Sequence, residues 1–165
     1  IGWLGSSKGG FELISNPAVI TSTEARQQLL NAHLHPIPRL KEGNLLIDNG
    51  VSAAMDISDG FLTDLHKFCE ASSVSAKIDS YKLPIEQALI NVFPDNYMDF
   101  ALNGGEDYAL IFSASPKIMD HLKGIIPAPF SIIGNMHRGR IGEVIIIDKL
   151  GHHILTASGG WDHYK

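Results

Sequence analysis

The 165-residue chain is long enough for one domain with a full core, or for two small domains at most. Its hydrophobic content of 44% is ordinary for a globular protein, and its formal net charge of −5 argues against general nucleic-acid binding, which needs Lys and Arg to neutralise phosphates. No apolar run approaches the roughly 18 residues of a membrane span, no signal peptide is visible, and the single cysteine excludes an internal disulfide, so we expect a cytoplasmic protein.

The first third of the chain predicts mainly turns and helix. "IGWLGSSKGGFELI" is typical of a glycine-rich turn that leads into an apolar stretch. "TSTEARQQLLNAHL" predicts a helix that Ser22 or Thr23 can cap, with Ala25, Leu29 and Ala32 on one face. The prolines of "HPIPRL" end this helix. The next stretch, "EGNLLIDNG", fits either a short helix or a strand.

The middle of the chain predicts a strand, a helix, a strand and a helix. "VSAAMDI" is typical of a buried strand, and "VSAKIDS" of a short alternating strand. "IEQALINVF" predicts a helix that ends at Pro94. Between the two strands, Gly60 to Ala71 is expected to be helical, and its apolar stripe consists of Phe61, Leu62, Leu65, Phe68 and Cys69.

The last third predicts strands around one helix. "EDYALIFSAS" alternates Tyr108, Leu110 and Phe112 with smaller residues, as a strand does. "PKIMDHLKGII" predicts a helix with Pro116 in its first turn. "FSIIGNM" and "EVIIIDKLGHHI" predict strands, the second turning at Leu150, and the tail "TASGGWDHYK" is polar.

The stretch "MDISDGFLTDL" carries a first candidate site. Asp56 falls near the end of the predicted strand, and Ser58 and Asp59 fall where the helix begins, at an edge where open α/β sheets commonly bind ligands. Two carboxylates and a hydroxyl suit Mg²⁺, which takes a few carboxylates together with water and phosphate oxygens. The alternatives are that Asp59 only caps the helix and that Asp56 is an edge-strand residue. Asp64 is expected to be a solvent-facing helical acid.

A second candidate site lies in "ALNGGEDYALIF". Gly104 and Gly105 come directly before Glu106 and Asp107, which open a predicted strand. Paired glycines let a backbone or a ligand come close, and adjacent acids are costly to bury unless they are solvated, paired or liganded. A hairpin turn with surface acids fits the pattern equally well.

Several familiar motifs are absent. "GSSKGG" lacks the spacing of a phosphate-binding Walker A loop, and no Gly-x-Ser-x-Gly elbow occurs. Two histidine pairs, at positions 33 and 35 and at positions 152 and 153, lack the spacing of zinc ligands. We interpret these histidines as solvated or helix-end residues.

Together these stretches resemble a known family. "MDISDGFLTDL", "AKIDSYKLPI", "ALNGGEDYALIF" and "GGWDHYK", in this order and with "HPIPR" before them, are similar to the C-terminal domain of thiamine-monophosphate kinase, in the aminoimidazole-ribonucleotide-synthetase superfamily. The resemblance covers residues 1 to 165. It implies a single α+β domain with a mixed β-sheet flanked by helices.

The resemblance also implies site residues. It makes Asp56 and Asp59 magnesium ligands, Ser58 an ATP contact, and Glu106 and Trp161 contacts to thiamine monophosphate. A carboxylate and an aromatic ring suit the cationic thiazolium of thiamine. Trp161 could instead be a ring that covers the edge of the core. Arg39 could pair with phosphate, but a structural ion pair is the favoured interpretation.

Two departures from the family pattern are visible. Family members begin with an N-terminal ATP- and Mg²⁺-binding domain with "GDD" and "GGDT" segments, and neither segment occurs here. Together with the first residue, Ile1, this makes us expect a fragment or a processed chain. In addition, Ser6 stands where the family usually has an acid.

We therefore expect the C-terminal, substrate-side half of an ATP-dependent kinase that converts thiamine monophosphate to thiamine diphosphate. The full-length enzyme is expected to be a cytosolic homodimer that uses Mg²⁺, and the chain alone is expected to be inactive. The alternatives are half of another ATP-dependent synthetase of the superfamily, making aminoimidazole ribonucleotide or selenophosphate, and a non-catalytic domain that binds thiamine phosphates.

Overall fold

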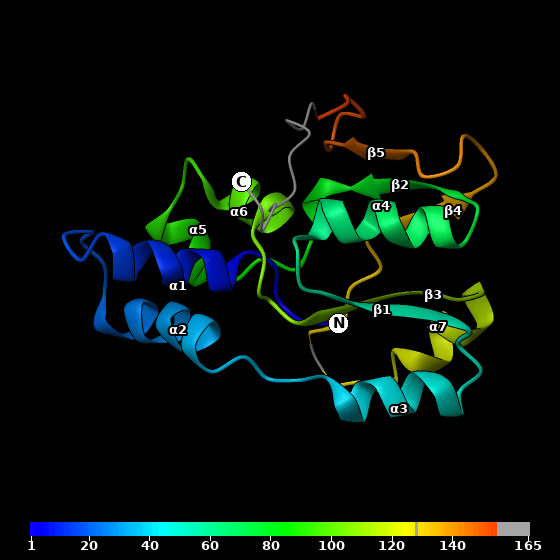
Figure 1. Cartoon of the computed structure of the whole chain (residues 1–165), viewed down its shortest axis with the longest axis horizontal. Helices are drawn as coiled ribbons and strands as arrows, with labels where there is room; N and C mark the ends of the chain where they lie inside the picture. Colours follow the sequence, from blue (N-terminus) through cyan, green and yellow to red (C-terminus); the bar gives the residue numbers. More distant parts are fainter. Residues whose placement is uncertain (128, 155–165) are drawn as a thin grey trace.

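A computed structural model describes residues 1–127 and 129–154 of the chain (Figure 1). Its helices are α1 (Ser6–Ser15), α2 (Thr23–Leu34), α3 (Leu40–Asp48), α4 (Phe61–Ala71), α5 (Gln87–Val92), α6 (Tyr97–Asn103) and α7 (Pro116–Leu122), with a short 3-10 helix at Ser80–Lys82. Its strands are β1 (Ala53–Ile57), β2 (Ser75–Asp79), β3 (Ala109–Ser113), β4 (Gly134–His137) and β5 (Val144–Ile147). Within the described ranges, no helix is both long enough and apolar enough to cross a membrane.

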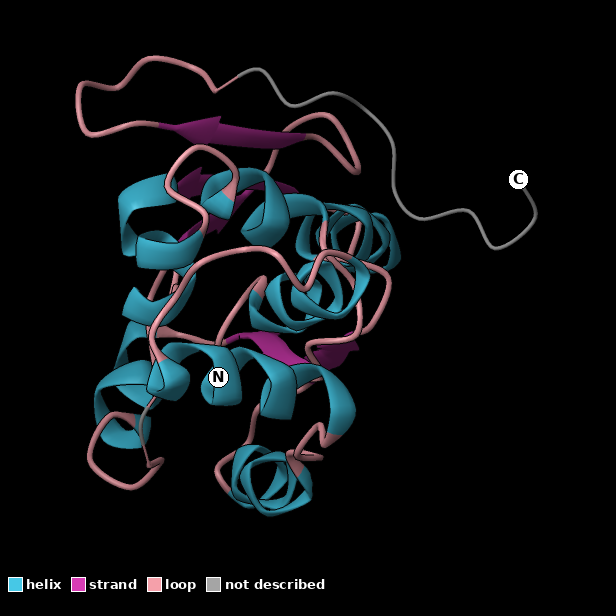
Figure 2. Cartoon of the chain, turned by 90° about the vertical axis from the view of Figure 1, so that its left-hand side faces the viewer, coloured by secondary structure: helices cyan, strands magenta, loops and turns pink. Residues whose placement is uncertain are grey.

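The strands form two sheets. β1 and β3 pair antiparallel, with Asp56 opposite Leu110. The other sheet has the order β4-β2-β5, and β2 is antiparallel to β4 but parallel to β5. In both overall views the two sheets lie at separate levels, with α3 beyond the two-stranded one (Figures 1 and 2). The prediction of an α+β fold with a mixed sheet flanked by helices is confirmed, the mixed pairing being that of β4-β2-β5.

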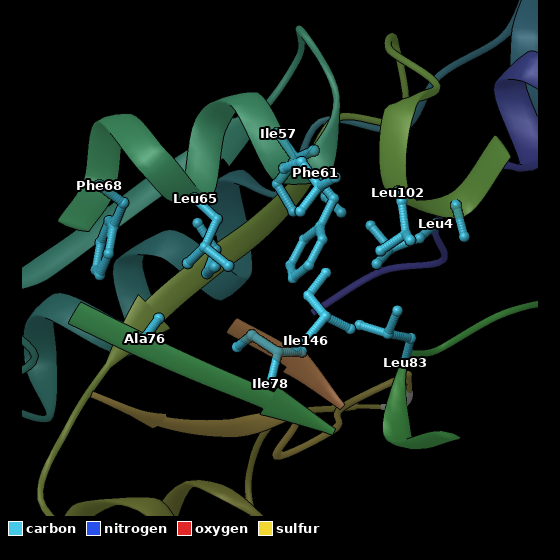
Figure 3. Close-up of a cluster of buried hydrophobic side chains, with 14 of the residues drawn as sticks. Leu4, Ile57, Phe61, Leu65, Phe68, Ala76, Ile78, Leu83, Leu102 and Ile146 are labelled. Atoms are coloured by element: carbon cyan, nitrogen blue, oxygen red, sulfur yellow. The ribbon is translucent and has the colours of Figure 1, made fainter. Parts of the chain in front are cut away.

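The main core lies between α4 and the three-stranded sheet. All five residues of the apolar stripe predicted for α4 are buried. Figure 3 shows Phe61, Leu65 and Phe68 reaching from α4 toward Ala76 and Ile78 on β2. Since each fully buried large apolar side chain contributes about 1.5–3 kcal/mol, this stripe is what holds α4, and the turn that precedes it, in place.

A second core joins the helices α1, α2, α5 and α6. Its buried members are Leu13, Leu29, Leu89 and Phe100, and α1 lies alongside α2 (Figure 1). The predicted cap of α2 is confirmed, because the Ala25 amide donates to Ser22 Oγ at 3.1 Å. The expectation of a turn throughout "GSSKGG" is wrong, since α1 begins at Ser6 and only Gly5 of this stretch lies in the bend before it.

Other predictions are refined by the structure. The ambiguous stretch "EGNLLIDNG" is helical, within α3, whereas α6 was not predicted at all. β1 is less buried than expected: Ile57 is buried, but Ala54 and Asp56 are exposed on its other face. β4 begins at Gly134, later than the pattern indicated. The predicted helices α4, α5 and α7 and strands β2, β3 and β5 are confirmed.

Candidate functional site

The turn between β1 and α4 is held by a buried carboxylate. Ser58 and Asp59 lie in this turn, and Asp64 follows one turn into α4. The side chain of Asp64 is 1% exposed, and its Oδ2 accepts hydrogen bonds from the amides of Ser58 (2.8 Å) and Asp59 (2.9 Å). The prediction that Asp64 faces solvent is therefore wrong. A buried charge is tolerated here because backbone amides and a cation satisfy it.

That cation is Lys67. Its Nζ donates to Asp59 Oδ2 at 2.5 Å and to Asp64 Oδ1 at 2.9 Å. These bonds, first the one with Asp59 and then the one with Asp64, raise the pKa of Lys67. The residue at the N-cap of α4 is Gly60, with no side-chain capping hydrogen bond. Asp59 therefore lies one residue before the N-cap position, and its carboxylate is oriented by Lys67.

The second acidic stretch meets this turn directly. The Glu106 amide donates to the Ser58 carbonyl at 2.8 Å, and the Tyr108 amide donates to the Ile57 carbonyl at 3.0 Å. A Cβ on Gly105 would lie 2.7 Å from the Ser58 carbonyl oxygen, so only glycine allows this approach. Glu106 (φ 67°) and Tyr108 (φ 49°) both adopt left-handed backbone conformations, which are uncommon outside glycine. Such conformations cluster at functional sites.

Three carboxylates raise the pKa of Tyr108, which lies beside the contact between the two acidic stretches. Its hydroxyl donates to Glu106 Oε2 at 2.8 Å. This hydrogen bond and the charge of Glu106 raise the pKa of Tyr108, and the charges of Asp56 and Asp59 raise it further. The acids of the two stretches, about fifty residues apart in the sequence, therefore lie around one phenol. Asp56 itself is exposed at the end of β1.

The donor set of Asp56 and Asp59 fits part of a magnesium site. Both offer hard carboxylate oxygens, and the charges of both raise the pKa of Tyr108. Mg²⁺ is usually held by one or two carboxylates with water and phosphate oxygens. Within residues 1–127 and 129–154, no three His, Cys, Asp or Glu side chains are grouped so that they alone could hold a metal. The magnesium role of these two residues stays a prediction.

Asp107 has a role different from that of its neighbour Glu106. Its Oδ2 accepts from the Gly5 amide at 2.6 Å and its Oδ1 from the Ser7 amide at 3.0 Å, so it binds the first turn of α1. Burial raises the pKa of Asp107 to about 7, and the charge of Glu86 adds to this, although the two amide hydrogen bonds lower it. Of the two adjacent acids, Asp107 binds backbone amides of α1, whereas Glu106 binds the hydroxyl of Tyr108.

The structure gives a reason why position 6 has a serine where the family usually has an acid. It is buried, and its Oγ donates to Glu86 Oε2 at 2.8 Å. Ser6, Glu86 and Asp107 line the same hollow. An acid at position 6 would therefore meet two other carboxylates, whereas a neutral donor satisfies Glu86.

A cavity of about 320 Å³ opens beside the two acidic stretches. Its lining residues are Ser7, Lys8, Phe11, His33, Ser58, Gly105 and Glu106. The structure thus brings Ser58 and Glu106 together on one cavity, while Asp56 and Asp59 are not among its lining residues. Trp161 lies outside the described residues.

The helical wall of this cavity was missed by sequence reasoning. Lys8 and Phe11 are three residues apart and so share a face of α1. This spacing would have placed them on one wall if the segment had been predicted as a helix. His33 is in the last turn of α2, as its interpretation as a helix-end residue requires, but its ring also lines the cavity, and its Nδ1 lies 3.0 Å from Ser7 Oγ.

Arg39 lies apart from this cavity. Its Nη1 is 3.5 Å from Glu42 Oε1, which confirms the favoured interpretation as a structural ion pair. Its Nε is buried without a hydrogen-bond partner among the described residues.

Comparisons with known proteins identify the family of the chain. The family model described as AIR synthase related protein, C-terminal domain, matches residues 6–147. The chain is 41% identical to the thiamine-monophosphate kinase of Buchnera aphidicola from Acyrthosiphon pisum over 123 residues, covering 74% of this chain and 38% of that protein. It is 33% identical to the thiamine-monophosphate kinase of Escherichia coli K12, covering 97% of this chain and 50% of that protein. It thus spans about half the length, or less, of these curated relatives.

One solved structure extends the similarity to three dimensions. It is that of AaThiL complexed with AMPPCP and TMP, which superposes with a TM-score of 0.78 at 28% identity. The superposition covers 99% of this chain and 49% of that protein. The resemblance predicted from the sequence motifs is confirmed by these comparisons.

Proposed function

This chain belongs to the family of the AIR synthase related protein, C-terminal domain, and we propose that it is the substrate-side half of a thiamine-monophosphate kinase. In the proposed reaction a phosphate oxygen of thiamine monophosphate attacks the γ-phosphorus of ATP. The bond from that phosphorus to its bridging oxygen breaks, thiamine diphosphate forms and ADP leaves. The chain spans about half the length of its curated relatives, so the remaining half is proposed to supply the N-terminal ATP-binding domain.

The observation that carries this proposal is the direct contact between the two acidic stretches. Two backbone hydrogen bonds, from Glu106 to Ser58 and from Tyr108 to Ile57, place a hydroxyl and a carboxylate on one cavity. A kinase needs such an arrangement, because phosphoryl transfer depends on positioning and charge neutralisation rather than on covalent chemistry by the protein. AaThiL, which binds an ATP analogue together with TMP, supports the assignment of both ligands.

Each residue has a proposed role. Glu106 faces the cationic thiazolium, and Ser58 donates to a phosphate oxygen of ATP. Asp56 and Asp59 would hold Mg²⁺, which, when bound, neutralises charge on the phosphates. Asp64 orients the Ser58–Asp59 turn through its two amide hydrogen bonds.

Further parts of the proposal rest on the family resemblance. Trp161 is proposed to contact the substrate ring. The full-length enzyme is proposed to be a cytoplasmic homodimer that uses Mg²⁺.

Calorimetric titration of the purified chain with thiamine monophosphate tests the proposal. We expect binding that weakens about tenfold or more in Glu106→Gln, because that change removes the charge facing the thiazolium. Asp120→Asn, which changes an exposed carboxylate on α7, is the matched control and should bind normally. Equal affinity in Glu106→Gln and the control, or no binding by the unaltered chain, would contradict the proposal.

A further inference from the structure

The walls of the cavity carry opposite charges. Lys8, on the first turn of α1, supplies an ammonium group, and Glu106, from the loop before β3, supplies a carboxylate. Ser7 and His33, which are hydrogen-bonded to each other, line the same cavity. A ligand that carries both a cation and an anion would therefore find a partner for each of its charges.

The base of the Lys8 side chain is packed against a loop, whereas its ammonium group is able to move. Its stem packs against the loop that bears Glu106, since a Cβ on Gly104 would lie 2.7 Å from Lys8 Cβ. Its Nζ is 2.6 Å from Glu12 Oε1 and 4.9 Å from the centroid of the Phe11 ring. Both members of the Lys8–Glu12 pair are about one third exposed, and such pairs contribute little. The ammonium can therefore exchange Glu12 for a more highly charged anion.

Two amides at the start of α1 are already occupied. The N-terminus of a helix usually attracts phosphate through its free amides. In α1 the amides of Gly5 and Ser7 are already bound to the carboxylate of Asp107. Among the described residues that line the cavity, Lys8 is the one with an ammonium group for an anion.

We propose that Lys8 binds the phosphate of thiamine monophosphate while Glu106 faces its thiazolium, so that this pair of charges fixes the direction of the substrate in the cavity. The inference rests on the proposed function and deepens it. Lys8 then determines specificity: it makes the cavity prefer the phosphorylated vitamin to thiamine, which has the same rings without the phosphate.

The test compares two ligands on the purified chain. Thiamine monophosphate and thiamine are titrated calorimetrically, without divalent cations, into the unaltered chain, Lys8→Met and the control Lys117→Met on the exposed side of α7. We expect the unaltered chain and the control to prefer thiamine monophosphate by about tenfold or more, the size of one charge-assisted contact. In Lys8→Met the preference should fall to about threefold or less, with thiamine affinity unchanged. Glu12→Gln, which releases Lys8, should keep or increase the preference.

The contrary outcomes are separable. If Lys8→Met keeps the full preference, or weakens both ligands equally, the inference is wrong while the proposed function stands. If the unaltered chain binds thiamine and thiamine monophosphate with equal affinity, the inference is also wrong. If it binds neither compound, both the inference and the proposed function are contradicted.

Discussion

At the scale of single residues, Asp64 and Lys67 organise the turn that carries Ser58 and Asp59. Asp64 was predicted to face solvent because a lone acid on a helix usually does. Nothing in its spacing indicates that its side chain folds back onto the amides of the preceding turn. The interaction depends on the geometry of the turn and on the position of α4 against the sheet.

Asp64→Ala tests this anchoring role. The change leaves the half-buried amides of Ser58 and Asp59 without their acceptor, and an unsatisfied buried group costs about 1–3 kcal/mol. We expect a loss of roughly 2–4 kcal/mol in the free energy of unfolding, measured by urea denaturation. The control is Asp120→Ala, which removes a matched i,i+3 pair with Lys123 in which both partners are exposed. It should change stability by less than about 0.5 kcal/mol. Equal losses would show that Asp64 has no anchoring role.

Asp59→Asn separates function from folding at the same turn. Gly60, not Asp59, occupies the N-cap of α4, and the pair with Lys67 is partly exposed, so we expect a melting temperature within about 3 °C of the unaltered chain. In an active enzyme the same change should reduce phosphoryl transfer by orders of magnitude, because Asp59 would hold Mg²⁺. A large drop in melting temperature would assign Asp59 a structural role instead.

At the scale of elements, α1 is the main feature that sequence reasoning missed. Adjacent glycines disfavour a helix by about 1 kcal/mol each, so Gly9 and Gly10 indicated a turn. The structure shows why glycine is present. A Cβ on Gly10 would collide with the Leu29 carbonyl of α2, and one on Gly9 would lie 2.6 Å from Leu89 Cδ1. Close packing of α1 on α2 overrides the local propensity.

Gly10→Ala should therefore destabilise the protein even though alanine favours helix. We expect a loss of about 1–3 kcal/mol from overpacking, measured by thermal or urea unfolding. Gly43→Ala is the matched control, since Gly43 lies in α3 with open space around its Cβ position. It should stabilise the chain by about 0.4–1 kcal/mol. The same sign of change in both variants would contradict the packing explanation.

The link between Asp107 and α1 predicts a dependence on pH. The folded pKa of Asp107, about 7, lies above the ordinary value of 3.8. The folded state therefore holds this proton more tightly than the unfolded state, and the resulting stability, present below pH 4, is lost as the pH rises to about 7.

Unfolding free energies at pH 5 and pH 8 measure this effect. The unaltered chain should lose on the order of 1–2 kcal/mol relative to Asp107→Asn, which cannot ionise, between these two pH values. Both proteins should show the same background change from other groups. If their difference is independent of pH, Asp107 does not retain its proton above its usual range.

At the scale of the whole molecule, local patterns predicted most of the elements but not how they meet. The stripe on α4, the cap of α2 and the alternation in β3 are visible within single stretches, and the structure confirms them. The division into two sheets, the exposed face of β1 and the wall formed by Lys8, Phe11 and His33 depend on contacts between distant segments. The pattern of one stretch does not encode such contacts.

In the candidate site, too, some features were predicted from single stretches and others depend on contacts between distant segments. The family resemblance predicted Ser58 as an ATP contact and Glu106 as a substrate contact, and in the structure both residues line one cavity. The roles of Asp64 and Asp107 follow only from hydrogen bonds to distant or turn amides. Sequence reasoning therefore named two residues that line the cavity, but not the residues that hold the turn and α1 in position.

Formation of thiamine diphosphate is the measurement that tests the central claim most directly. We would compare the purified chain with a hybrid in which it replaces the matching half of the Escherichia coli K12 relative, which it resembles over 97% of its length. With ATP, Mg²⁺ and thiamine monophosphate, we expect thiamine diphosphate from the hybrid, none from the chain alone, and a rate lower by orders of magnitude from the hybrid carrying Asp59→Asn. A folded hybrid that binds ATP but makes no thiamine diphosphate, while the Escherichia coli enzyme does, would contradict the account.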